Sequence, residues 1–252
     1  MIKKLLSQFT LGLIITFICL SSHAQSIDKQ TIQAKIGKHL KTIIDKEMSA
    51  LTSMACKIND RTCLEKELIE RYRLDQWVRD EFYKLKACGE YLKDHKSECR
   101  SMLMGSTVFQ IDLPNTRRLK EIMKAHNFPT PPNFSKEAQI AAWYIVQHAQ
   151  FIGKTGTTVW DADLAESILP SVKKGIAAGN LTPWHYAAMF DRIALTRGKP
   201  QKFATQITCQ GGKAVFKKLI DKNRIDEFRN EIGMKKFKQS DYDSYCQENE
   251  PG

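Results

Sequence analysis

Two residues that can do acid–base chemistry stand on helix faces that are otherwise apolar. The first is His148, which shares one face with Ala141, Tyr144 and Ile145 in the helical pattern of residues 135–151. A histidine in a cleft can serve as a general base, because its ordinary pKa lies near neutrality. A histidine in a core is instead held by satisfied hydrogen bonds, so this position allows both interpretations.

The second residue is Asp191, which shares a face with Ala187 and other apolar residues in the helical pattern of residues 183–196. A buried carboxylate without partners costs several kcal/mol, so Asp191 must be paired or neutralised. In a polar-lined pocket Asp191 would orient His148, whereas in a structural network it pairs with whichever neighbours fix the packing of the helices; the spacing alone does not decide between them. The adjacent Arg192 points about 100° away on an ideal helix, where it can bind an anion.

A further set of polar residues lies in a segment that alternates like a β-strand. Residues 201–220 predict a hairpin of two strands, with its turn at 210–213. Alternation places Gln201 and Thr205 on the side of the larger apolar groups, and Gln206 on the opposite side. Polar groups on an inward side need hydrogen-bond partners.

The polar residues support two hypotheses from different functional classes. In the first, a polar cluster around His148, Asp191 and Gln201 organises a binding or structural domain of the cell envelope. In the second, His148 is the general base of a hydrolase-like enzyme, and Arg79 or Arg192 binds the substrate. The chain contains no His-x-x-x-His pair, no Gly-x-Ser-x-Gly and no glycine-rich phosphate loop, so we predict no metal site and name no cofactor.

The elements that must position these residues are mostly helices. Gly105 to Pro114 breaks the helical period and predicts a loop, after which Asn115 is expected to cap a helix. The predicted fold is mainly α, a disulfide-stapled helical domain with one small carboxy-terminal β-hairpin. Helices are expected over residues 26–54, 64–87, 90–102, 115–126, 135–151, 162–178, 183–196 and 226–232.

The first residues are typical of a secretory signal peptide. Lys3 and Lys4 precede an apolar run over residues 9–20, and small residues lead to an expected cleavage after Ala24. An uncleaved anchor and a lipid attached to Cys19 both fit less well, because the apolar run is short and the residues before this cysteine are bulky. We therefore predict a periplasmic or secreted protein without a transmembrane segment after cleavage. The expected parts are the signal peptide (1–24), an amino-terminal helical extension (25–60) and the main helical domain (61–252).

Six cysteines remain after signal cleavage, and an even count in an exported chain predicts disulfides. Pairing of nearest neighbours is our first prediction, and a nested arrangement of the first four cysteines is its alternative. The nearest-neighbour pairs are Cys56–Cys63, Cys88–Cys99 and Cys209–Cys246.

The chain is basic, with 39 Lys and Arg residues against 28 Asp and Glu residues. A basic exported protein can face an anionic envelope component. The cations are nevertheless dispersed along the sequence without a long block of one sign, which favours an ordinary solvated surface. No motif indicates specific binding to nucleic acid.

Five stretches together resemble one known family. They read DQWVR (residues 75–79), DLPNTRRLKEIMKAHNFP (112–129), AAWYIVQHAQ (141–150), DRIALTRGKPQKFATQ (191–206) and DEFRNEIGM (226–234). Their order and spacing resemble the uncharacterised bacterial family catalogued as domain of unknown function 6624, over about residues 64–245.

The resemblance implies no reaction, but it implies that the polar candidates belong to a recurring set. Phe203 and Ala204 stand where the family pattern has Tyr-Gly, so a tyrosyl hydroxyl is missing here. The candidate catalytic residues are His148, Asp191 and Arg192, and the candidate ligand-binding residues are Gln76, Arg79, Gln201, Thr205 and Gln206.

Overall fold

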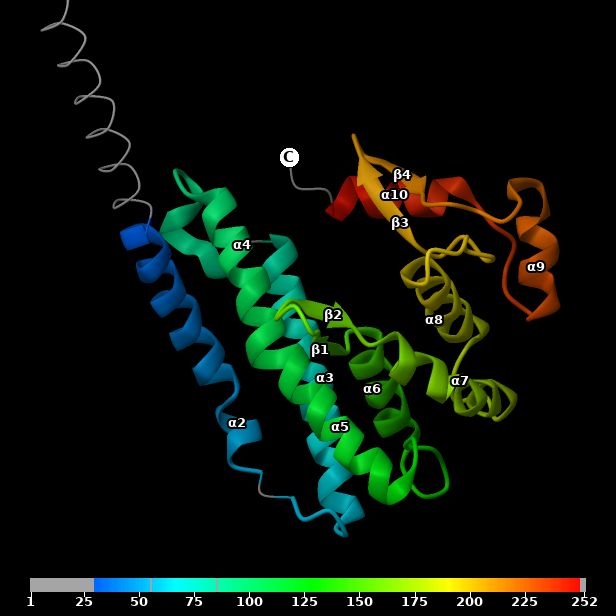
Figure 1. The fold of residues 1–252 in the computed structure, drawn as a ribbon, viewed down its shortest axis with the longest axis horizontal. Helices are drawn as coiled ribbons and strands as arrows, with labels where there is room; N and C mark the ends of the chain where they lie inside the picture. The colour runs from blue at the N-terminus through cyan, green and yellow to red at the C-terminus, as the bar shows by residue number, and fades with distance from the viewer. Residues whose placement is uncertain (1–29, 55, 85, 250–252) are drawn as a thin grey trace, which may run out of the picture.

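The computed structural model describes residues 30–54, 56–84 and 86–249, and the predicted signal peptide lies outside these residues (Figure 1). The described part is mainly helical, as the sequence predicts, and it carries two antiparallel strand pairs. No helix within it is long and apolar enough to cross a membrane.

A helical segment over residues 30–47 precedes the numbered elements and lies beside the long helices α3, α4 and α5 (Figure 1). The helices are α2 (Ser49–Thr52), α3 (Arg61–Lys84), α4 (Lys96–Thr107), α5 (Leu113–His126), α6 (Lys136–Gln147), α7 (Ala162–Ala177), α8 (Pro183–Thr196), α9 (Ile225–Glu231) and α10 (Gln239–Asn249). The strands are β1 (Gln150–Ile152), β2 (Thr158–Trp160), β3 (Ile207–Gln210) and β4 (Lys213–Phe216), paired β1–β2 and β3–β4.

Capping residues fix where the central helices begin. The Ser135 side chain accepts a hydrogen bond from the backbone N–H of Ala138 at the start of α6. At the start of α8, Thr182 and His185 form a reciprocal capping box around Pro183, whose missing N–H suits the first turn. The predicted bounds of α8 are therefore confirmed.

The main hydrophobic core surrounds Trp143, which is fully buried on α6. Leu68 of α3, Leu119 of α5, Ile168 of α7 and Met189 of α8 belong to the same cluster. One core therefore connects the helices that carry the polar candidates, and burying these side chains stabilises their relative positions.

A second core connects the amino-terminal helical segment to the rest of the described chain. Ile36, Leu40 and Ile44 recur at a helical spacing and are buried. They share a cluster with Val78 of α3 and Leu103 of α4. The segment therefore packs on the long helices through a continuous apolar stripe.

The loop expected over residues 105–114 is wrong. The helix continues from α4 through a π-helical turn, Val108–Asp112, into α5, which accommodates Pro114 in its first turn. Asn115 is not a cap but lies buried inside α5, where its Oδ1 accepts a hydrogen bond from Arg71 at 2.9 Å. Glycine and proline signals led to this error, although both residues are compatible with a helix at these positions.

The predicted carboxy-terminal hairpin is confirmed only in part. Strands β3 and β4 are joined at the predicted turn and pair Ile207 with Phe216. Residues 201–206 form no strand but a loop over α8, joined to Leu219 by one isolated bridge. The hairpin β1–β2 and helix α10 were not predicted, since each is short or lacks a marked apolar stripe, and the helix expected over 135–151 ends at Gln147 because β1 begins at Gln150.

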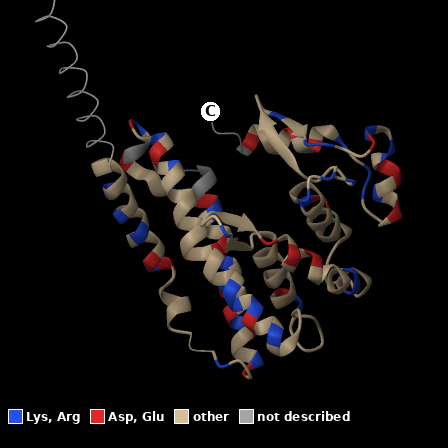
Figure 2. Cartoon of the chain, in the orientation of Figure 1, with Lys and Arg blue, Asp and Glu red and all other residues tan. Residues whose placement is uncertain are grey.

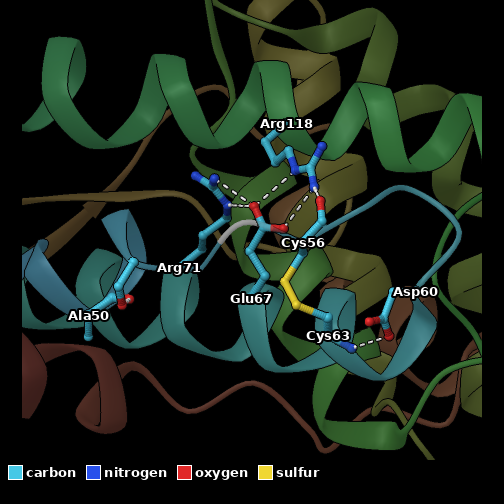
Figure 3. Close-up of a disulfide and its surroundings, with 8 residues drawn as sticks. Ala50, Cys56, Asp60, Cys63, Glu67, Arg71 and Arg118 are labelled. Atoms are coloured by element: carbon cyan, nitrogen blue, oxygen red, sulfur yellow. Dashed lines mark hydrogen bonds and ion pairs between the residues drawn. A yellow bond between two sulfur atoms is a disulfide. The ribbon is translucent and has the colours of Figure 1, made fainter.

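The three nearest-neighbour disulfides are confirmed. The bond between Cys56 and Cys63 holds the chain before α3 against the start of that helix (Figure 3). Beside it, the buried Glu67 carboxylate accepts hydrogen bonds from Arg71 and Arg118, and Arg118 also donates to the Cys56 carbonyl (Figure 3). A buried charge is therefore paired on two sides.

Candidate functional site

His148 lies at the carboxyl end of α6, and its imidazole faces a carboxylate of α3. The Nδ1 atom lies 2.9 Å from each carboxylate oxygen of Asp75. Because an ionised carboxylate only accepts hydrogen bonds, Nδ1 carries the proton and Nε2 carries the lone pair. Asp75 is 1% exposed, whereas the His148 side chain is 19% exposed. The pair therefore has a buried anion behind an imidazole that reaches the surface.

Other side chains hold Asp75 from the far side. Gln76 Nε2 donates to Asp75 Oδ2 at 2.7 Å, and Arg79 Nη2 lies 3.4 Å from Asp75 Oδ1. Arg79 Nη2 also donates to Asp112 Oδ1 at 2.9 Å. We call Asp75, Gln76, Arg79, Asp112 and His148 the His148 cluster.

Local backbone geometry brings this cluster together. Asp75 and Arg79 are four residues apart, so they lie one turn from each other on α3. Asp112 ends the π-helical turn, a local widening of the helix that recurs at functional sites. Thr116, one turn later, donates its hydroxyl to the Asp112 carbonyl and accepts from the backbone N–H of Gln150, the first residue of β1.

Burial dominates the electrostatics of the His148 cluster. It raises the pKa of Asp112 to about 7, and nearby Asp75 adds to the rise while Arg79 opposes it. Burial also lowers the pKa of His148 below its ordinary value, although the hydrogen bond that its imidazole donates to Asp75 opposes this shift. The positive charges of Arg79 and Arg192 lower the His148 pKa further. The imidazole is therefore neutral at neutral pH and has the form of a base.

The exposed edge of His148 opens into a pocket of about 670 Å³. Arg192 lines the same pocket, and its guanidinium lies over the indole ring of Trp160, 4.8 Å from the ring centroid. This contact holds the guanidinium near Trp160, in the pocket that His148 also lines. Other lining residues are Gln147, Trp184, Ala188, Thr205, Gln206, Ile207, Arg229, Met234, Lys235, Lys236, Asp241, Tyr242 and Tyr245.

Asp191 does not contact His148, which corrects the pairing expected from the sequence. Its fully buried carboxylate accepts hydrogen bonds from the backbone N–H groups of Lys202, Phe203 and Thr205, at 2.7 to 3.1 Å. The Thr205 hydroxyl donates to the same carboxylate at 2.9 Å. Asp191 does have the hydrogen-bond partners that a buried carboxylate requires, and they come from the loop that follows α8.

Gln201 closes the same loop. Its Nε2 donates to the carbonyls of Gln206 and Lys217, at 2.9 and 3.0 Å, and its Oε1 accepts from the Gln206 N–H. Within the loop, Ala204 has φ of 54°, a left-handed conformation that glycine adopts at less cost. The family pattern that this stretch resembles has glycine at the position of Ala204. The pattern therefore reflects the left-handed backbone conformation that the loop requires.

Arg229 of α9 binds the loop from the other side. Its Nε donates to the Phe203 carbonyl at 2.9 Å, and its guanidinium contacts the Tyr242 hydroxyl. Arg229 is 3% exposed. We call Asp191, Gln201, Thr205, Gln206 and Arg229 the Asp191 anchor.

The candidate residues thus divide between two places. His148, Gln76 and Arg79 meet in the His148 cluster, while the others except Arg192 lie in the Asp191 anchor. Arg192, Thr205 and Gln206 reach the pocket that His148 lines. Sequence reasoning missed Asp75 and Asp112 as site residues, although both lie in stretches that carry the family resemblance.

Among residues 30–54, 56–84 and 86–249, no group of three or more His, Cys, Asp or Glu side chains is arranged to hold a metal ion. The His148 cluster has two carboxylates and one imidazole, but Arg79 pairs with both carboxylates as their counterion. The arrangement therefore suits proton transfer and anion binding.

Comparison with known families gives a match over residues 63–242, to a family described as "Family of unknown function (DUF6624)". No curated protein and no solved structure matches the chain. The match covers all residues of the His148 cluster and of the Asp191 anchor.

Proposed function

Since the chain belongs to this family of unknown function, we propose its activity from its own geometry: an exported, hydrolase-like enzyme with His148 as its general base. The observation that carries the proposal is the pair of Asp75 and His148, with the imidazole edge in a pocket that Arg192 also lines. Asp75 is the orienting residue in place of Asp191.

The proposed chemistry is hydrolysis of an ester-type bond. His148 Nε2 takes a proton from water, and the water oxygen forms a bond to the electrophilic carbon or phosphorus. The leaving oxygen departs with the electron pair of the broken bond and takes the proton back from the imidazolium. Asp75 stabilises the imidazolium while it exists, and Arg192 binds the negative charge that develops on the substrate.

Unsatisfied polar atoms near His148 support binding of a polar ligand there. Gln147 Oε1 in the pocket lining, and Arg79 Nη1 in the His148 cluster outside that lining, are buried without a hydrogen-bond partner among the described residues. Leaving such groups unpaired costs free energy, which a ligand or solvent contact recovers. The Asp191 anchor has no such atoms among its described side chains.

Export is the second part of the proposal. The amino-terminal signal-peptide pattern and three disulfides support a periplasmic or secreted location, because disulfides persist in oxidising compartments. Fractionation of cells followed by amino-terminal sequencing tests it. We expect the mature chain to begin at Gln25, and an intact Met1 in the cytoplasmic fraction would contradict export.

A binding domain of the envelope without turnover is the second candidate function. The cations that line the pocket favour it, because Arg192, Lys235 and Lys236 attract an anionic envelope component whether or not His148 acts on it. In this case the polar residues hold a ligand and organise the fold, and no bond is broken.

The decisive experiment compares wild type, His148→Gln and the control His95→Gln on a panel of chromogenic carboxylic and phosphoric esters. His95 is a half-exposed histidine before α4. Replacing a general base lowers the rate by about 10²- to 10⁴-fold, so we expect a loss of that size for His148→Gln alone, with a melting temperature close to wild type. A thermal shift by anions without turnover of any ester supports the binding domain instead. Loss of fold in His148→Gln would assign His148 a structural role.

A further inference from the structure

A second pocket adjoins the one that His148 lines. Its volume is about 830 Å³, and it extends from Trp160 along the end of α8 to the chain after β4. The two pockets share Arg192, Gln206 and Ile207 as lining residues. The linings of the two pockets therefore adjoin along these three residues and form one surface, with His148 on one side.

This surface is strongly basic. Five lysines line it in addition to the arginines, whereas Asp241 is its one acidic lining residue. The five are exposed, and none forms an ion pair with a described residue; they are Lys199, Lys217, Lys218, Lys235 and Lys236. Elsewhere in the described chain lysines do pair, as Lys120 does with Asp161. Lys and Arg are spread over the described chain in Figure 2, so what distinguishes this surface is the excess of cations over its single acidic lining residue.

We propose that the two pockets bind one extended polymer of phosphodiester-linked units, with a linking phosphate beside His148. The proposal rests on the proposed hydrolase function and names its substrate class. Several lysines along one surface suit a ligand with a charge on each repeating unit, since a single small anion contacts only a few of them.

The position of Arg192 favours phosphodiesters over polymers of carboxylates. Arg192 lines both pockets, and His148 lines one of them with it. An anionic group bound by Arg192 therefore lies in the pocket into which the proposed general base, His148, opens. In a phosphodiester polymer the charged group is also the bond to be hydrolysed, whereas in a polycarboxylate the charges lie beside the linkage. Hydrolysis adds water across one P–O bond and yields a phosphomonoester and an alcohol.

The test measures binding of short and long single-stranded oligothymidylates and of poly(glycerol phosphate) to the full mature protein, with polyglutamate as the carboxylate polymer. The variant is Lys217→Gln/Lys218→Gln, because only the backbone carbonyls of these residues hold the fold, through Gln201. The matched control is Lys66→Gln/Lys174→Gln, two exposed lysines outside both pockets.

We expect affinity to rise with polymer length and to fall as salt is added. Each lost phosphate contact reduces the slope of log affinity against log salt by about 0.7, which corresponds to about fivefold weaker binding at about 0.1 M salt. Lys217→Gln/Lys218→Gln removes two such contacts, so we expect about 25-fold weaker binding for this variant and no loss for the control. Preference for one of the two phosphodiester probes identifies nucleic acid or a glycerol phosphate polymer as the source.

Two results would overturn the polymer proposal: affinity independent of length, or equal binding of polyglutamate. Failure of the proposed function has a different signature. The polymer then binds with the expected dependence on both lysines, but wild type releases no phosphomonoester. If both ideas hold, His148→Gln retains the affinity for polymer and loses the release of product.

Discussion

Asp75 of the His148 cluster and Asp191 of the Asp191 anchor are both buried, yet their carboxylates have opposite surroundings. Asp191 accepts hydrogen bonds from three backbone N–H groups and one hydroxyl, none of which can titrate near neutral pH. Asp75 is held by an imidazole, an amide and a guanidinium. Neutral backbone donors fix a loop, whereas an imidazole donor brings a proton that can move.

The two regions also differ in access to the surface. Asp191 and Gln201 are fully buried, and their polar contacts with described residues stay within the loop and its neighbours. His148 lines a pocket and leaves one ring nitrogen for a ligand. A polar residue on an apolar helix face therefore does not identify a site by itself. The nature of its donors and the presence of an open edge decide between structure and chemistry.

The largest effect should come from the Asp191 anchor. Asp191→Ala leaves several buried N–H groups without an acceptor, each at a cost of about 1–3 kcal/mol, so we expect a loss of about 3–5 kcal/mol in the free energy of unfolding. Urea unfolding measures this loss. The control Asp163→Ala removes a carboxylate that is 95% exposed, and it should cost less than about 1 kcal/mol. Equal losses in the two variants would show that the hydrogen bonds to Asp191 do not stabilise the loop.

Asp75→Asn tests the His148 cluster through activity rather than stability. Without the carboxylate, the imidazolium loses its counterion, and we expect a loss of about a hundredfold in kcat/KM, or about 2.7 kcal/mol. Asp75 also raises the pKa of His148, so the acidic limb of the rate profile should move to lower pH in the variant. Asp80→Asn, on the same helix but 45% exposed, is the control. An unchanged pH profile in Asp75→Asn would contradict the orienting role of Asp75.

Asp112 should make stability depend on pH. Its folded-state pKa of about 7 lies above the ordinary 3.8, so the folded state binds the proton more tightly and stability falls as pH rises through this window. We expect Asp112 to contribute a loss of about 2 kcal/mol between about pH 5 and about pH 6.5. The lowered pKa of His148 has the opposite effect, because protonation of this residue destabilises the fold at low pH.

The difference between wild type and Asp112→Asn isolates the carboxyl, since the amide is isosteric and does not titrate. Melting temperatures of both proteins across this pH range measure it, with Asp80→Asn as the control. Parallel curves would mean that Asp112 is ionised throughout and that Arg79 outweighs its burial.

The sequence predicted those features that depend on residues close together in the chain, such as helix starts and short-range disulfides. Pro183 and the residues around it mark the start of α8, and short sequence separations favour the disulfides that form. The pairing of His148 with Asp75 spans 73 residues and depends on how α3 packs against α6. Residue spacing does not determine how these two helices pack, so Asp191 was predicted as the partner instead.

The loop of residues 201–206 shows a second limit. Its alternation of polar and apolar residues fits a strand, but the same residues can also direct successive N–H groups toward one buried carboxylate. The choice depends on Asp191, ten residues before Gln201, and on the left-handed backbone of Ala204. A pattern read along the chain contains neither the carboxylate's position nor this backbone angle.

Gln206 belongs to the Asp191 anchor and also lines both pockets. Gln206→Ala therefore tests whether this residue stabilises the loop or binds ligand, and we expect it to have the smallest effect on stability of the variants. Its side chain donates to the Ala188 carbonyl at 3.2 Å, whereas its backbone N–H makes the contact with Gln201. We therefore expect a loss of about 1 kcal/mol in the free energy of unfolding, since the backbone contact survives the change. Urea unfolding and oligothymidylate binding measured on the same variant separate the two roles. A loss near that of Asp191→Ala would place Gln206 wholly in the anchor, whereas unchanged stability with weaker binding would place it in the pocket surface.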